Sequence, residues 1–255
     1  MAVLAEILTS EKNGRLARTI VNRIWARLMG RGLIEPNDDM DRPPWDEDLL
    51  DWLATDFVEN GYAIKKTMER ILTSEAYQLP AVSWDGKAKD AFTFQGPVVK
   101  RLSAEQFCDA LSAITGIWEA TPAAKVEFAA EAPPIKGVRS WLTKRNMLTV
   151  SLGRPSREQV VSQRPSAATT LQGLELTNGE TLAKRLKEGA KELVRAHESA
   201  TDALIRDVYL RAMSRSPSQE EFSAVAGLIE DSTGAEGVED FLWAVAMLPE
   251  FQLIY

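Results

Sequence analysis

The chain contains only one cysteine and one histidine among its 255 residues. The single cysteine, Cys108, excludes an internal disulfide framework, and we expect it to be a buried, inert thiol. The single histidine, His197, lacks the partners that a histidine-based zinc site or covalent haem attachment would need. A glycine-rich phosphate loop, a Gly-x-Ser-x-Gly elbow and a His-Glu-x-x-His motif are also missing. We therefore expect no cofactor and no metal.

Long apolar runs and an excess of basic charge are missing as well. No apolar run approaches the roughly 20 residues of a membrane-spanning helix, and the net charge is −7. General nucleic-acid binding needs a basic surface, so we expect neither membrane insertion nor a nucleic-acid partner. The N-terminus has no basic segment before its apolar residues. We predict that it forms a short helix with Leu4, Ile7 and Leu8 facing inward, not a signal peptide.

Helical periodicity is what the sequence does contain. Asn13 is a suitable N-cap for a first long helix, and Gly30 is suited to end it. We place Asn22 and Arg23 in the middle of this helix, off the centre of its apolar stripe. The stripe is broad: Leu16, Ile20, Ile24 and Leu28 repeat every four residues, with Val21 and Trp25 beside them.

Helix-start signals recur along the rest of the chain. Ser103 and Gln106 have the spacing of a capping box, and Ser216 followed by Pro217 resembles a capped helix with proline in its first turn. Trp141–Val150 is predicted to be one extended segment. Strand alternation of useful length is absent, so the sequence predicts an all-α fold.

We predict a compact multi-helix array with long irregular loops and at most minor extended segments. It is treated as a single domain, residues 1–255, with possible lobes 1–78 and 103–255 packed together. The irregular segments are 79–102 and 117–145.

An acidic loop follows the first long helix. Part of it fits a calcium-loop template at positions 1, 3, 5 and 12, which are Asn37, Asp39, Asp41 and Asp48. Position 6 is Arg42 instead of the glycine that the sharp turn requires, and two prolines follow. We therefore favour a capping role for these carboxylates, with Asp46 capping the next helix.

The stretch from Ser151 to Asn178 is rich in charged, planar side chains. Two interpretations remain open for them. They could clamp a carboxylate, sulfate or phosphate beside a helix N-terminus. They could instead pin the connector to the helix at 15–30 and to the acidic loop, which we favour. The residues concerned are Arg154, Arg157, Glu158 and Arg164.

Five blocks of the sequence resemble a planctomycete-type domain of unknown function, number fifteen fifty-three. The resemblance runs over essentially the whole chain, and the order and spacing of the blocks make it specific. The blocks are Arg18–Trp25, Gly30–Leu33, Leu49–Leu53, Ser151–Glu158 and Leu248–Phe251.

The resemblance implies a context but no established activity. In longer relatives this domain is the C-terminal part, after another uncharacterised domain and often a cytochrome-c-like domain, in proteins that carry an export signal. It suggests a fragment or truncated gene product, with those domains as partners and an extracytoplasmic location if the chain belongs to a longer protein. Many relatives have Ser-His where this chain has Trp45–Asp48, so no role can be given to a histidine there.

Two functional hypotheses follow. The first is a non-catalytic interaction or scaffold module of a multidomain exported protein. The second is a hydrolase acting on an anionic or polysaccharide-derived substrate, with its site where Arg154, Arg157 and Glu158 meet Asn22, Arg23 or the acidic loop. The candidate binding residues are Asn22, Arg23, Arg154, Arg157, Glu158 and Arg164.

Overall fold

The structure is a computed structural model. Most of the chain that it describes is helical, and the sheet found there has two strands of two residues each. The predicted all-α class is therefore confirmed. No helix in this part of the chain is long and apolar enough to cross a membrane. The residues described are 2–10, 13–84, 92–123, 137–156, 158, 161, 164, 168–198, 200–232 and 235–255.

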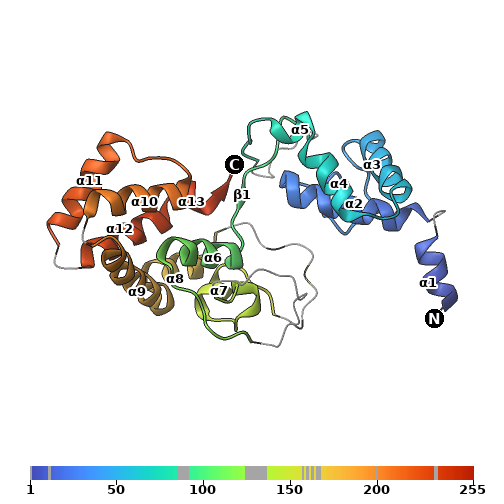
Figure 1. The fold of residues 1–255 in the computed structure, drawn as a ribbon. Helices are drawn as coiled ribbons and strands as arrows, with labels where there is room; N and C mark the ends of the chain where they lie inside the picture. The colour runs from blue at the N-terminus through green and yellow to red at the C-terminus, as the bar shows by residue number, and fades with distance from the viewer. Residues whose placement is uncertain are drawn as a thin grey trace. The chain divides into compact units, whose positions relative to one another are not determined.

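The elements follow one another as shown in Figure 1. They are α1 (Ala2–Thr9), α2 (Gly14–Met29), α3 (Glu47–Glu59), α4 (Ile64–Leu72), α5 (Glu75–Gln78), β1 (Lys100–Arg101), α6 (Ala104–Thr115), the 3-10 helix η1 (Ser140–Leu142), α7 (Met147–Ser151), α8 (Thr170–Asn178), α9 (Glu180–Ala196), α10 (Thr201–Met213), α11 (Gln219–Glu230), α12 (Glu236–Met247), α13 (Pro249–Gln252) and β2 (Leu253–Ile254).

The chain divides into two compact units, each with its own hydrophobic core. The first unit comprises residues 1–100 with Tyr255, and the second comprises residues 101–254. The packing of lobes 1–78 and 103–255 against each other stays a prediction.

In the first unit, α2 packs against α3 and α4. Asn13 caps α2 as predicted, and Gly30 ends it with a φ of +82°. A Cβ at Gly30 would also lie 2.3 Å from the carbonyl oxygen of Val98, so both the conformation and the space require glycine. Asp46 caps α3, as predicted, by accepting from the amide of Leu49 at 2.9 Å.

The burial of Val21 and Trp25 confirms one side of the predicted stripe, and the buried face of α2 is rotated toward that side. Ile20, Ile24 and Leu28 pack only at the edge of the core. The rotation brings Asn22, predicted off the stripe centre, fully into the interior, where it bonds the loop that follows α2. The buried residues of α2 are Ala17, Val21, Asn22, Trp25 and Met29.

The prediction for α1 was wrong about its packing. The helix forms, but the side chains of Leu4, Ile7 and Leu8 are each more than half exposed. Among the described residues, the core of the first unit contains none from α1. Apolar periodicity marks a face that can be buried, but it does not supply the element that buries it.

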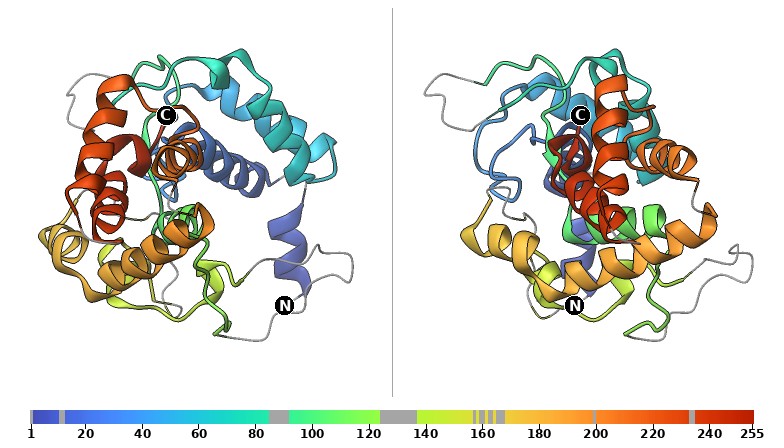
Figure 2. Two further views of the ribbon diagram at one scale, coloured as in Figure 1. Left: turned by 60° about the vertical axis from the view of Figure 1, so that its left-hand side comes forward. Right: turned by 90° about the vertical axis from the view of Figure 1, so that its left-hand side faces the viewer.

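In the second unit, α6 contacts α7, α9, α10 and η1, and α9 lies along α12. Figure 2 shows the α9–α12 pair from two further sides. The predicted capping box of Ser103 and Gln106 is confirmed at the start of α6. The hydrophobic core of the second unit includes Phe107, Leu148, Leu186, Val208 and Phe241.

Two local predictions for the second unit were wrong. Trp141–Val150 is not extended, because η1 and α7 occupy most of it, with Asn146 capping α7. The helix after Met213 is capped by Ser218 instead of Ser216, with Glu221 completing the capping box. The first error overlooked the capping signal at Asn146, and the second chose a serine two residues before the one that caps α11.

Candidate functional site

The polar cluster of the second unit begins at the first turn of α6. The hydroxyl of Ser103 accepts from the backbone amide of Gln106. The side-chain oxygen of Gln106 in turn accepts from the backbone amide of Ser103 at 2.9 Å. This capping box fixes the direction of the first turn and therefore the position of Glu105. One turn later, Asp109 accepts from the amide of Ser140 at 2.8 Å, which ties η1 to α6.

Arg154 is the most buried charged side chain of this cluster, with 9% of its surface exposed. After α7 ends, Gly153 turns the chain with a φ of +86°, and the amide of Arg154 donates to Thr149 at 2.9 Å. The guanidinium donates to the carbonyl oxygens of Ser140, Trp141 and Thr143 at 2.9, 3.1 and 2.9 Å. These three bonds hold the backbone of η1 and the turn behind it.

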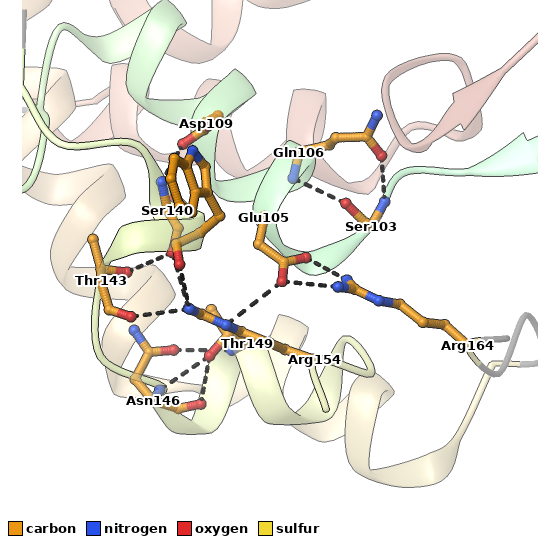
Figure 3. Close-up of polar contacts among 11 residues, drawn as sticks. Ser103, Glu105, Gln106, Asp109, Ser140, Thr143, Asn146, Thr149, Arg154 and Arg164 are labelled. Atoms are coloured by element: carbon orange, nitrogen blue, oxygen red, sulfur yellow. Dashed lines mark hydrogen bonds and ion pairs between the residues drawn. The ribbon is translucent and has the colours of Figure 1, made fainter. Parts of the chain in front are cut away.

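The acidic partner of Arg154 is Glu105. The Nε atom of Arg154 lies 3.5 Å from Oε1 of Glu105. Arg164 reaches the same carboxylate with both terminal nitrogens, one of them at 3.1 Å (Figure 3). We call the set Arg154, Glu105, Arg164 and Asp109 the Arg154 clamp.

Electrostatics in the Arg154 clamp favour the ionised carboxylate. Burial raises the pKa of Glu105, but the hydrogen bond and charge of Arg164, with the charge of Arg154, outweigh burial and leave it below its ordinary value. A carboxyl group of lowered pKa that is already paired with two guanidinium groups is a poor general acid. Glu105 is therefore better suited to holding Arg154 and Arg164 in place than to donating a proton.

The structure adds to the predicted partners of the connector. Within the second unit, Arg154 and Arg164 pair with Glu105 of α6, a partner that the sequence analysis did not name. Glu158 is exposed, and its amide donates to Ser156 at 3.4 Å. Arg157 lies outside the described residues. Sequence reasoning missed Glu105 because it stands 49 positions before Arg154; its place in the turn after Ser103 was the available signal.

The other two candidates, Asn22 and Arg23, belong to the first unit. Asn22 is fully buried and donates to the carbonyl oxygens of Ile34 and Asn37 at 3.1 and 3.2 Å. It also accepts from the amide of Ile34 at 2.9 Å. Arg23 pairs with Asp38 at 2.5 Å on the surface. Both side chains therefore fasten the loop after α2 to that helix.

Cys108 and His197, which could act as a nucleophile or in proton transfer, are each engaged within the second unit. Cys108 is 1% exposed, and burial raises the pKa of its thiol to about 11, so it stays protonated at neutral pH. The ring of His197 lies with Nδ1 at 2.9 Å from the carbonyl oxygen of Leu193 and Nε2 at 3.2 Å from Asp207. In the described ranges, no three His, Cys, Asp or Glu side chains gather as metal ligands would.

The fold and the cluster define a class: a helical domain in two units, whose arginine-rich connector is bonded to the backbone and carboxylate of its own unit. The chain belongs to the PSD1 family, whose description is "protein of unknown function (DUF1553)"; the family model matches residues 2–229. This agrees with the resemblance drawn from the sequence blocks. No curated protein and no solved structure matched the chain.

Proposed function

We propose that this chain is a non-catalytic interaction module that acts as a scaffold within a larger, exported multidomain protein. The Arg154 clamp supports the proposal most directly. The buried guanidinium of Arg154 donates to three carbonyl oxygens and pairs with Glu105. The most chemically promising group of the connector therefore already stabilises the local backbone. Occupied donors stabilise a surface; they are not available to bind a substrate anion.

The carboxylate of Glu105 in the clamp and the thiol of Cys108 on the same helix support the same proposal. Cys108 carries a raised pKa and Glu105 a lowered one, which is the reverse of what a nucleophile and a general acid need. The hydrolase alternative therefore gains neither a nucleophile from Cys108 nor a general acid from Glu105.

Association measurements test the proposal. The purified chain is titrated calorimetrically with a cytochrome-c-like domain and with the uncharacterised domain that accompany this family, each produced separately. We expect saturable binding to at least one of them in the micromolar range. An absence of heat and of co-sedimentation with both at high micromolar concentration would contradict a scaffold role.

A second measurement addresses catalysis. The wild-type chain and Glu105→Gln are incubated with a panel of acidic polysaccharides, and reducing ends are counted. We expect no turnover by either protein and a lower melting temperature for the variant. The proposal would be refuted if the wild type hydrolysed a substrate and the folded Glu105→Gln variant did not.

A further inference from the structure

The segment Arg139–Met147 combines exposed apolar side chains with exposed positive charges. Trp141 and Met147 are 56% and 54% exposed, although the rest of the second unit buries a large apolar core. Arg139, Lys144 and Arg145 are exposed in the same nine residues, and no acidic residue interrupts them. The segment therefore carries three positive charges within a chain of net charge −7.

Lys144 and Arg145, near the C-terminal end of this segment, are available to bind an anion. Arg139 lies 3.6 Å from Asp109 and over the ring of Trp118, so it is partly engaged. Neither Lys144 nor Arg145 forms an ion pair within the part of the chain that the structure describes. Among the described residues their charges therefore have no acidic partner and can act on an approaching anion.

The backbone that carries Trp141 is held rigidly from inside. Arg154 bonds the carbonyl oxygens of Ser140, Trp141 and Thr143, and Asp109 bonds the amide of Ser140. Figure 3 shows these bonds meeting at η1. A backbone that is already fixed need not be ordered on binding, and tryptophan is enriched among binding hot spots.

From this combination we infer that Arg139–Met147 is a docking surface for an acidic protein segment that also carries an apolar side chain, with Trp141 as its central contact. The inference rests on the proposed interaction function and names the kind of partner. Charge selects the partner: Lys144 and Arg145, with the partly engaged Arg139, attract acidic groups locally, while the net charge of −7 disfavours a long polyanion such as nucleic acid.

Fluorescence anisotropy tests this surface. The probe is a short, fluorescein-labelled peptide that alternates aspartate and leucine, and it is titrated with the full chain at low salt. We expect Trp141→Ala to weaken binding about tenfold or more. The pair Lys144→Ala and Arg145→Ala should weaken it severalfold and flatten its salt dependence.

The chain offers a matched control. Trp52 is 53% exposed on α3 in the first unit, beside the guanidinium of Arg70, so Trp52→Ala removes a similar side chain elsewhere. Trp52→Ala should leave binding unchanged. Circular dichroism melts confirm that each variant folds, and Met147→Ala serves as a second variant, with a smaller loss expected.

Besides a failure of the peptide to bind the wild type, three results would overturn the inference. One is equal binding by wild type and Trp141→Ala; another is an equal loss from Trp52→Ala. The third is tighter binding of a short oligothymidylate than of the peptide, which would assign the surface to nucleic acid. If the peptide fails while the family's neighbouring domains still bind, only this inference fails; if both fail, the proposed function fails as well.

Discussion

In each unit a buried side chain holds an irregular segment against a helix. The two buried side chains, Asn22 and Arg154, differ in charge. In the first unit the neutral amide of Asn22 bonds the loop after α2 and is fully buried. In the second unit Arg154 and Glu105 hold η1 through charged groups that stay partly in reach of solvent. A neutral, buried fastening responds to neither acid nor salt, whereas an ionic one responds to both. The predictions below test this difference.

The largest effect is expected at Asn22. Asn22→Leu removes the bonds to Ile34 and Asn37 and leaves an amide and two carbonyl groups unpaired in the interior. Each buried unpaired group costs roughly 1–3 kcal/mol, so we expect a loss of at least about 3 kcal/mol in the free energy of unfolding. Urea denaturation measures it.

The control for Asn22 is the adjacent surface pair. Arg23→Ala removes the ion pair with Asp38, which is exposed and should contribute no more than about 1 kcal/mol. Similar losses for Asn22→Leu and Arg23→Ala would show that the buried amide does not fasten the loop.

The second effect concerns Arg154. Arg154→Ala removes three bonds to carbonyl oxygens and one of the two positive partners of Glu105. We expect a loss of about 2–3 kcal/mol, smaller than at Asn22 because water can reach part of the site. Hydrogen exchange of the Ser140 amide should accelerate, while the amide of Ile34 in the first unit should be unaffected.

Arg154→Lys sharpens this experiment. Lysine keeps the charge but lacks the planar fork that reaches three carbonyl oxygens, so it should rescue little of the loss. Full rescue by lysine would mean that charge alone matters at this position. The thiol of Cys108 provides a second readout, since it should react with a disulfide reagent only when the second unit opens.

The third prediction concerns acid. The pKa of Glu105 is lowered in the folded protein, so its contribution to stability is present above its unfolded pKa, near 4.5, and is lost as the pH falls through the lower folded value. The pKa of Glu221, paired with Arg215, is lowered to about 2 and acts in the same direction. The second unit should therefore weaken as the pH falls below about 4.5.

The acid test compares variants at two pH values. Urea denaturation at pH 7 and pH 3 should show a smaller pH dependence for Glu105→Gln than for the wild type. Because the neutral fastening does not titrate, Asn22→Leu should keep the pH dependence of the wild type. An equal dependence in Glu105→Gln and wild type would mean that Glu105 does not contribute.

The sequence predicted features that depend on neighbours in the chain. The caps at Asn13, Asp46 and Ser103 bond residues two or three positions away, and all three were confirmed. Partners that are distant in sequence were missed, because no local pattern connects Arg154 with Glu105. Burial of Asn22 was missed for the same reason, since its bonds to Ile34 and Asn37 depend on how the loop returns to α2.

The smallest effect is expected at Arg164. Its side chain is 41% exposed, and Glu105 keeps Arg154 when Arg164 is removed. Exposed ion pairs contribute about 0–1 kcal/mol, so Arg164→Ala should lower the free energy of unfolding by about 0.5 kcal/mol. The loss should shrink further in high salt, because the pair is within reach of ions. A loss as large as that of Arg154→Ala would place the main fastening of the second unit at its exposed side, and the contrast between the two units would then lie in exposure as well as in charge.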